Sequence, residues 1–255
     1  MQEIPDTRIM FDGRMEAKKI EESLKISGKL EGKGLLILQC DGSSTESTYI
    51  RLKRQMAERL GVETRVLFVW EKDIIMKEIE KGNEDNSIDG ILVQLPIKGA
   101  NREEIEQILS TINPVKDIDG LNPKSSFVPA AVVAVETVME KINLSRNLAV
   151  AIVGAEGMVG KALYGRLSEL GYVVSGFDMG DDLMKLNDFD VVVSCTGQEG
   201  LITGDMVKQG FVGIDLGFPQ GDISEEAGGK ARVITPVPGG VGPLTIVSLF
   251  VSMAA

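Results

Sequence analysis

The stretch Ala151-Ile152-Val153-Gly154-Ala155-Glu156-Gly157-Met158-Val159-Gly160 (AIVGAEGMVG) decides the fold class. An apolar run typical of a buried strand passes through glycines into a helix. From Ala155 to Gly160 the spacing is A-x-G-x-x-G, close to a dinucleotide-binding fingerprint but without its first glycine. Glycine lets a backbone approach a pyrophosphate, and a helix N-terminus binds its charge. A tight strand–helix turn requires glycine in any case, so the motif alone is a moderate signal.

The next strand strengthens the dinucleotide interpretation. It is predicted at residues 172–177 and ends at Asp178. An acidic residue at this point hydrogen-bonds the adenosine ribose and repels a 2′-phosphate, so the pattern favours NAD over NADP. The candidate cofactor-binding residues lie in the loops that follow the predicted strands: Gly154, Ala155, Glu156, Gly157, Met158, Val159, Asp178, Thr196 and Gly197.

Strand-like and helix-like segments alternate on both sides of this unit, which is typical of βαβ units with parallel sheets. We predict strands at residues 34–40, 64–70, 88–93, 148–153, 172–177, 190–194, 211–215 and 233–234. Helices are predicted at residues 46–60, 72–81, 102–110, 129–143, 158–170 and 243–253. The fold class is therefore two-domain α/β, with a boundary near residue 130 and a last helix that packs back on the first domain.

Composition limits the class of function. The 255 residues suit two domains, and 43% hydrophobic with only 5% aromatic content predicts an aliphatic core. The formal charge of −11 disfavours nucleic acid and anionic membranes as partners. The absence of histidine excludes Ser-His-Asp and Cys-His nucleophile systems and the usual zinc sites, and we predict no metal site.

The thiols and the two chain ends bear on the compartment. Cys40 and Cys195 lie in apolar, strand-like runs, which favours buried free thiols over a disulfide. The first five residues have neither a basic start nor an apolar core of a signal peptide. The longest apolar run, residues 244–255, is too short to span a bilayer. We expect a cytosolic protein.

A lysine falls on the apolar side of a predicted helix. Tyr49, Lys53, Met56 and Leu60 share one stripe at helical spacing, and the last two indicate that this stripe faces the core. A lysine there either extends its amine outward to water or is desolvated with a lowered pKa. The second alternative suits proton transfer, next to an aromatic ring that can stack on a flat ligand.

Polar residues follow two further segments. Gln94 continues directly from the strand predicted at 88–93, where ligands of open α/β sheets bind. It could hold Lys53 or a ligand, or it could cap loose backbone groups. Asp119-Gly120 is most often an ordinary turn. If Asp119 instead faces a ligand, its two oxygens can accept hydrogen bonds from the N–H groups of a heterocycle.

The segment Thr235-Pro-Val-Pro-Gly-Gly-Val-Gly-Pro243 precedes a predicted helix. Its prolines restrict the backbone, whereas its glycines allow many backbone conformations. Helix initiation alone does not require so many glycines, so the segment favours a close approach of backbone to a ligand.

Together these motifs resemble the bifunctional methylenetetrahydrofolate dehydrogenase/cyclohydrolase family. The resemblance runs from Phe11 to the C-terminus and is most specific at Tyr49-x-x-x-Lys53, Gly90–Pro96, Lys116–Gly120 and Pro238–Pro243. It implies a catalytic domain of residues 1–130 completed by residues 238–255, a Rossmann domain of residues 131–237, a folate cleft where they meet, and a homodimer.

The resemblance also implies the reactions. Hydride passes from 5,10-methylenetetrahydrofolate to the nicotinamide of NAD or NADP, and water then converts 5,10-methenyltetrahydrofolate to 10-formyltetrahydrofolate. The implied catalytic residues are Lys53 for proton transfer, Gln94 to orient and tune it, Tyr49 against the folate and Asp119 on the pterin ring. The implied substrate-binding residues are Tyr49, Val93, Gln94, Leu95, Asp119, Pro238, Gly239, Gly240, Val241 and Gly242.

The chain departs from the family pattern at several points. Ser44-Thr45-Glu46 replaces Pro-Ala-Ser, and a Glu46–Lys53 pair would raise the lysine pKa and weaken the hydrolytic step. Pro129-Ala130-Ala131-Val132 replaces Pro-Cys-Thr-Pro. Gly154-Ala155-Glu156 replaces Gly-Arg-Ser, and Phe177-Asp178-Met179 replaces Cys-His-Ser. The last two changes point away from NADP, toward NAD or a lost dehydrogenase.

Three alternatives to the bifunctional enzyme stay open at this point. One is a cyclohydrolase with a vestigial cofactor domain, and nicotinamide binding discriminates against it. A second is a non-catalytic folate-binding protein, which has no evident use for a buried lysine. The third is a different two-domain Rossmann oxidoreductase, which the proline-glycine segment disfavours.

Overall fold

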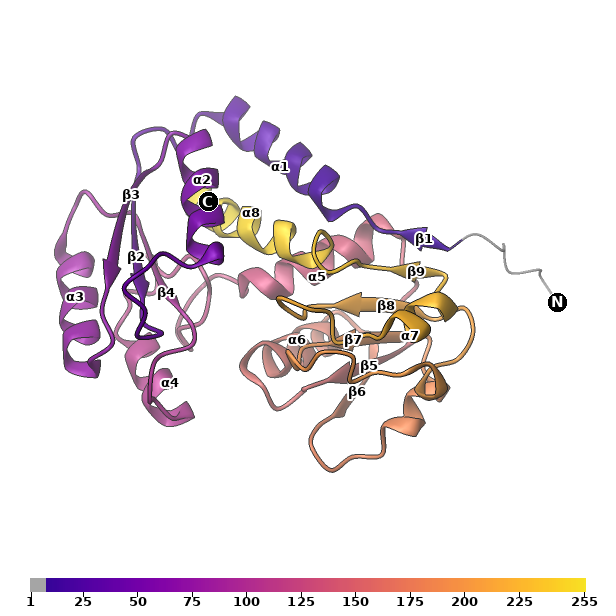
Figure 1. Cartoon of the computed structure of the whole chain (residues 1–255). Coiled ribbons are helices and arrows are strands. Elements are labelled where there is room, and N and C mark those ends of the chain that lie inside the picture. The colour runs from indigo at the N-terminus through magenta and orange to yellow at the C-terminus, as the bar shows by residue number, and fades with distance from the viewer. Residues whose placement is uncertain (1–7) are drawn as a thin grey trace. The chain divides into compact units, whose positions relative to one another are not determined.

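The computed structural model describes residues 8–255, which form two compact units (Figure 1). One unit contains residues 18–130 and 246–255, and the other contains residues 8–17 and 131–245. The sequence prediction instead grouped residues 1–130 with 238–255. The difference at the N-terminus has a physical cause, since β1 (Ile9–Met10) pairs in parallel with β9 (Val233–Ile234). The chain therefore passes between the units near residues 17, 130 and 245.

The unit around residues 18–130 contains a three-stranded parallel sheet in the order β3-β2-β4. Its strands are β2 (Gly34–Gln39), β3 (Glu63–Phe68) and β4 (Gly90–Gln94), and its helices include α2 (Thr48–Arg59), α3 (Lys72–Glu84) and α4 (Arg102–Ser110). The central strand β2 is buried at every position, which explains its almost continuous apolar sequence. In Figure 1 the helices flank this sheet.

Local signals set the helix starts in this unit. Ser47 caps α2, because its hydroxyl accepts a hydrogen bond from Ile50 N. Asn101 and Glu104 form a reciprocal capping box at the start of α4. Since the α2 cap fixes where the helix begins, it also fixes which side chains of α2 face the sheet.

The other unit contains a six-stranded parallel sheet in the order β1-β9-β8-β7-β5-β6. The further strands are β5 (Ala149–Val153), β6 (Val173–Phe177), β7 (Val191–Ser194) and β8 (Val212–Asp215). The helices are α5 (Ala130–Lys141), α6 (Met158–Glu169), the short α7 (Glu225–Lys230) and the 3₁₀ helices η1 (Leu183–Asp188) and η2 (Gly204–Met206). The predicted strand–glycine–helix unit is β5–α6.

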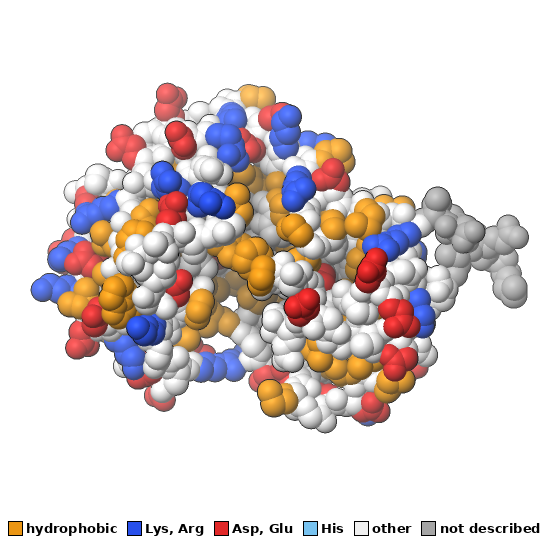
Figure 2. Space-filling view, viewed as in Figure 1, with side chains coloured by type: hydrophobic (Ala, Val, Ile, Leu, Met, Phe, Trp, Pro, Cys, Tyr) orange, Lys and Arg blue, Asp and Glu red, His pale blue; other side chains and the backbone are white. Residues whose placement is uncertain are grey.

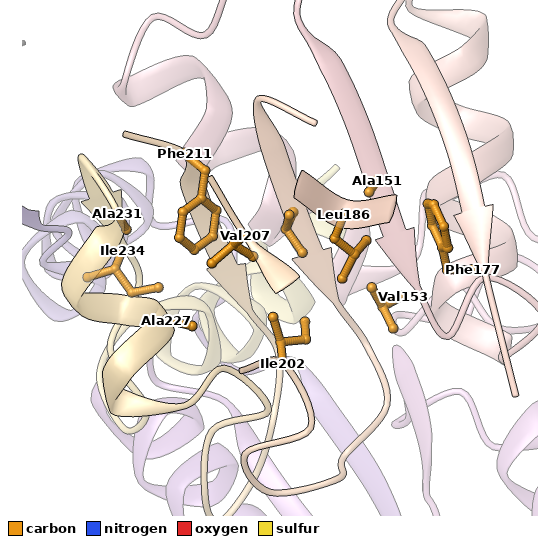
Figure 3. Close-up of a cluster of buried hydrophobic side chains, with 11 residues drawn as sticks. Ala151, Val153, Phe177, Leu186, Ile202, Val207, Phe211, Ala227, Ala231 and Ile234 are labelled. Atoms are coloured by element: carbon orange, nitrogen blue, oxygen red, sulfur yellow. The ribbon is translucent and has the colours of Figure 1, made fainter. Parts of the chain in front are cut away.

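One buried cluster covers a face of this sheet (Figure 3). Strand side chains meet residues from η1, α7 and their loops; the members are Ala151, Val153, Phe177, Leu186, Val192, Ile202, Val207, Phe211, Ala227, Ala231 and Ile234. Phe177 also packs edge-on against Phe189, with ring centroids 5.4 Å apart. This cluster anchors the ends of β5, β6 and β7 from which the predicted cofactor loops leave.

Two helices contain residues of both units, because the boundary between the units falls within them. α1 (Gly13–Ser27) starts in the unit with residues 131–245 and ends in the other, and α8 (Val241–Ala254) does the same. The sequence analysis did not predict α1, β1, α7, η1 or η2. For α1 a signal was present, because Asp12 caps the helix by accepting a hydrogen bond from Met15 N at 2.9 Å.

Acidic and basic side chains are interspersed on the face shown in Figure 2. Across residues 8–255, the helices are too short or too polar to cross a bilayer. Both cysteines are free thiols, as predicted; Cys40 is buried and Cys195 partly exposed.

Candidate active site

Lys53 lies on the inner face of α2, where the residue spacing placed it. Only 6% of its surface is exposed, so it does not extend outward to water. Its Nζ donates a hydrogen bond of 2.8 Å to Oε1 of Gln94, at the end of β4. Burial lowers the pKa of Lys53 below its ordinary value, because the charged amine loses hydration. The structure therefore selects the desolvated alternative.

Gln94 presents one definite side of its amide to the lysine. Its Nε2 donates a hydrogen bond of 2.9 Å to the carbonyl of Leu95. That bond turns Oε1 toward Lys53, and it leaves the lysine with an acceptor that carries no charge. Gln94 therefore orients the amine without raising its pKa as a carboxylate would. The neighbouring candidates differ in burial: Val93 is buried in the sheet, whereas Leu95 is partly exposed.

Asp119 supplies the negative charge near the lysine. Its charge raises the pKa of Lys53, opposing the larger effect of burial. Burial raises the pKa of Asp119 itself, and the lysine charge opposes that shift. The turn that the sequence suggested is also formed, since Gly120 has φ +68° and its N–H donates to the Asp117 carbonyl. The turn and the electrostatic contact with Lys53 coexist.

Tyr49 stands one helical turn before Lys53 on α2 and is partly exposed. Burial raises the pKa of its phenol, so the hydroxyl stays protonated over the physiological range. An aromatic ring that is partly exposed can serve as an apolar surface for a flat ligand.

The condition under which Glu46 would raise the pKa of Lys53, a pairing of the two residues, gives way to a different ion pair. Glu46 instead binds Arg54 through both oxygens, at 2.8 Å to Nε and 3.3 Å to Nη2. Arg54 follows Lys53 directly and is exposed, so the guanidinium reaches the carboxylate while the lysine faces inward. A planar guanidinium also suits bidentate binding better than an amine does. The carboxylate that replaces the family hydroxyl is therefore neutralised outside the lysine environment.

The glycine loop has the geometry that its sequence predicted. Gly154 has φ +85°, and a side chain on Gly160 would lie 2.1 Å from the Gly154 carbonyl. Gly157 is the N-cap of α6 and leaves the first helical N–H groups without a side-chain cap. Such a helix N-terminus fits a pyrophosphate, since its free amides donate and its dipole favours negative charge.

Asp178 contacts the same loop. Its Oδ2 accepts a hydrogen bond of 2.8 Å from the backbone N of Glu156. Its own backbone N donates to Asp181 Oδ2 at 2.7 Å. The carboxylate is thus held beside the glycine loop at the end of β6, with Oδ1 uninvolved in either of these two bonds.

The proline-glycine segment is explained only in part by the chain itself. Gly239 has φ +118°, and a side chain on Gly240 would lie 2.6 Å from Thr235 Cβ. Both positions therefore require glycine for backbone reasons. Gly242, in the first turn of α8, has ordinary φ and open space around its missing side chain. Of these three glycines, Gly242 is the one that neither φ nor packing explains.

Comparison with known proteins shows that these features belong to one protein family. The catalytic-domain model of the tetrahydrofolate dehydrogenase/cyclohydrolase family matches residues 11–119, and the NAD(P)-binding-domain model matches residues 129–255. The chain belongs to this family. The bifunctional protein FolD of Staphylococcus haemolyticus is 33% identical, over 94% of this chain and 90% of the relative. FolD of a Hydrogenobaculum species is 32% identical, over 95% and 96%.

Solved structures agree with the family assignment. The bifunctional FolD enzyme of Campylobacter jejuni has a TM-score of 0.86 and 28% identity, covering 97% of this chain and 98% of that chain. The Trypanosoma brucei enzyme, solved with NADP and an inhibitor, has a TM-score of 0.86 and 27% identity, covering 96% of each chain. The two-domain α/β class predicted from the sequence is confirmed, as is the family.

The sequence did not reveal the hydrogen-bonding roles of several polar residues, most of them buried. Gln39, at the end of β2, binds Asp41, Thr45 and Ser47 and so holds the loop before α2. Lys116 donates to three carbonyls at the end of α3, those of Gly82, Asn83 and Asp85. Asp215, the last residue of β8, and Asp222, in the loop that follows, are both buried. A rule already applied to Gln94, that polar residues at strand ends matter, would have found Gln39 and Asp215.

Proposed function

We propose that this chain uses Lys53 to hydrolyse 5,10-methenyltetrahydrofolate and uses NAD in preference to NADP to form that substrate. The chain is a methylenetetrahydrofolate dehydrogenase and methenyltetrahydrofolate cyclohydrolase of one-carbon folate metabolism, as its family membership gives. The observation that carries the proposal is the buried Lys53 hydrogen-bonded to a neutral acceptor.

The hydrolytic step needs a base that can take a proton from the attacking water. Burial lowers the pKa of Lys53, so its amine gives up its own proton more readily than an exposed lysine does and can then act as that base. The water oxygen bonds to the methenyl carbon as one water proton passes to the Lys53 amine. The hydroxyl left on that carbon then loses its proton to water as the C=O bond forms and the bond from the carbon to N5 breaks, and N5 gains a proton. Gln94 holds the amine in place, and we assign Asp119 to the pterin ring and Tyr49 to its face.

The proposed cofactor residues would bind a dinucleotide through backbone N–H groups and not through the side chains of Lys or Arg. We assign the loop Gly154–Val159, Asp178, Thr196 and Gly197 to this site. NAD, when bound, accepts the hydride that leaves the folate. The preference for NAD rests on Asp178, whose carboxylate is held beside the glycine loop, where it would repel a 2′-phosphate.

We propose a further contribution to folate binding from the segment Pro238–Gly242, on the grounds of the open space at Gly242. Val93 and Leu95 complete the proposed substrate contacts through the end of β4. A homodimer and a cytosolic location stay predictions. Light scattering and cell fractionation, respectively, check them.

The lysine assignment is tested by measuring hydrolysis of supplied methenyltetrahydrofolate with Lys53→Ala. We expect loss of the cyclohydrolase reaction, while Lys77→Ala, an exposed lysine of α3, keeps the wild-type rate. Circular dichroism confirms that both variants fold. A Lys53→Ala variant with the wild-type rate would remove Lys53 from the mechanism.

The cofactor assignment is tested by turnover of 5,10-methylenetetrahydrofolate with NAD and with NADP. We expect turnover with NAD, and a shift toward NADP in Asp178→Ser because the repelling charge is gone. Asp182→Ser, the exposed cap of η1, is the matched control. Turnover with NADP alone overturns the preference, and turnover with neither, while hydrolysis persists, identifies a cyclohydrolase with a silent cofactor domain.

A further inference from the structure

Two buried carboxylates connect the loops that follow β7 and β8. Asp222 is fully buried and Asp215 is 3% exposed, and both belong to the unit with residues 131–245. Neither is needed for the folate chemistry proposed above. Buried carboxylates cost free energy unless several donors surround them, so two in one place require an explanation.

Asp222 binds the loop that contains two of the proposed cofactor residues. Its Oδ2 accepts from Thr196 N at 2.9 Å, Thr196 Oγ1 at 2.8 Å and Gly197 N at 3.1 Å. It also accepts from Ser194 Oγ at 2.7 Å. A neutral amide oxygen cannot satisfy four donors as well as an ionised carboxylate does. The conformation of the loop after β7 therefore depends on a charged group at residue 222.

Asp215 holds Asp222 in this position. At the end of β8, its Oδ1 accepts from Gly217 N at 2.8 Å and from Asp222 N at 3.1 Å. Its Oδ2 accepts from Ile223 N at 2.9 Å. A chain of hydrogen bonds thus runs from the sheet through Asp215 to Asp222, and from there to Thr196.

Two glycines make room for these oxygens. A side chain on Gly217 would lie 2.6 Å from Asp222 Oδ1, and one on Gly221 would lie 2.7 Å from Asp215 Oδ2. Within residues 8–255, Asp222 Oδ1 has no hydrogen-bond partner although it is buried. The carboxylate is therefore retained at a cost in stability, which is typical of residues that serve function.

The loop that Asp222 holds adjoins the glycine loop. A side chain on Gly154 would lie 3.2 Å from the backbone carbon of Cys195 and 3.3 Å from Thr196 Cγ2. The loops after β5 and β7 are therefore packed against each other at neighbouring strand ends. A shift of Thr196 would change the space available at the glycine loop.

We propose that Asp222 is a positioning residue for the nicotinamide cofactor, because it fixes the backbone of Thr196 and Gly197 in the conformation that binds it. The inference rests on the proposed assignment of these two residues to the cofactor site. Asp215, Gly217 and Gly221 act through Asp222, and the folate chemistry proposed for Lys53 assigns no role to any of them.

The test compares Asp222→Asn and Gly217→Ala with the control Asp190→Asn. Asp190 stands at the opposite end of β7, where it accepts from Ala149 N at 2.9 Å and Lys208 Nζ at 2.7 Å. Its loss weakens the same strand without touching the Thr196 loop. Calorimetric titration gives the Kd for NAD and NADP, cyclohydrolase kinetics report on Lys53, and thermal unfolding reports on stability.

We expect both Asp222→Asn and Gly217→Ala to raise the Kd of the preferred cofactor by roughly tenfold or more, since charge-assisted hydrogen bonds are lost or displaced. Cyclohydrolase kcat/KM stays at the wild-type value, and Asp190→Asn keeps the wild-type Kd. If wild type binds cofactor and both test variants bind equally well, the positioning role is overturned while the proposed function stands. If wild type binds neither NAD nor NADP, the positioning role and the proposed use of NAD are both overturned, whereas the assignment of hydrolysis to Lys53 is decided by the cyclohydrolase kinetics.

Discussion

Lys53 differs from an ordinary buried lysine in the charge of its partner. Gln94 is neutral, and the opposing charge of Asp119 does not offset the loss of hydration. The amine therefore releases its proton at lower pH in the folded protein than in the unfolded chain. This property connects the mechanism with stability, because a pKa that changes on folding makes the free energy of unfolding depend on pH.

The stability of the wild type should rise with pH relative to Lys53→Met. Between the lowered folded pKa and the unfolded value of 10.5, the unfolded chain binds more protons at this residue. The difference in unfolding free energy between the two proteins then grows by up to about 1.4 kcal/mol per pH unit. Urea unfolding at neutral pH and at successive higher pH values measures it. A difference that is flat up to the unfolded pKa would show that the lysine titrates normally.

At the residue scale, spacing predicted some of the site and could not predict the rest. The i, i+4, i+7 pattern sufficed to place Lys53 on the inner face of α2, because Met56 and Leu60 mark the buried side. The partner of Glu46 could not be predicted, since Lys53 and Arg54 are adjacent in sequence and only the structure shows which one faces outward. The role of Asp222 could not be predicted either, because its hydrogen-bond partners at residues 194–197 are distant from it in sequence.

At the scale of elements, hydrophobic patterns predicted the ends of most strands and of several helices to within one or two residues, as strand β9 and helix α4 show. The short α7 was missed because two of its six residues are glycine, which disfavours a helix. Its formation depends on tertiary contacts, since Ala227 packs in the sheet cluster, and on the cap from Ser224. Burial of Ala227 thus stabilises this helix although its sequence has a low helix propensity.

The first turn of α8 offers a prediction about glycine. In Gly242→Ala, the added methyl group meets open space and reduces the freedom of the unfolded chain, so stability should rise by roughly 0.5 kcal/mol. The KM for methenyltetrahydrofolate should rise, because the methyl group enters space that we assign to the folate. Thermal unfolding and cyclohydrolase kinetics check the two effects.

Gly165→Ala is the matched control for this prediction. Gly165 lies within α6, and a side chain there also meets nothing within 4 Å. It should give a similar gain in stability with an unchanged KM. Equal kinetics in the two variants would exclude Gly242 from the folate site.

At the scale of the whole molecule, the compact units do not follow the order of the chain. Residues 246–255 join the unit built from residues 18–130. Lys33 Nζ donates to the Met253 carbonyl at 2.7 Å and Lys29 Nζ to that of Ala254 at 3.2 Å, so both lysines hold the end of α8. Phe250 is fully buried, whereas its neighbour Val251 is 40% exposed.

Truncating Phe250 should therefore destabilise the protein strongly. We expect Phe250→Ala to lower the free energy of unfolding by about 3–5 kcal/mol, because it removes a large buried ring. Val251→Ala, one position along the same helix, should cost much less. Urea unfolding followed by circular dichroism compares them, and similar losses in both variants would contradict the role of α8 as a core element.

The three passages of the chain between units have a consequence for synthesis on the ribosome. The segment 18–130 is translated early, but residues 246–255, which belong to the same unit, are translated only after the whole of residues 131–245. Likewise, β1 waits for β9, which is made more than two hundred residues later. The unit that begins at residue 18 therefore cannot be completed before the residues of the other unit have been translated, which excludes folding of the two units one after the other from the N-terminus. Nascent chains should stay sensitive to proteases until residues 246–255 have left the ribosome.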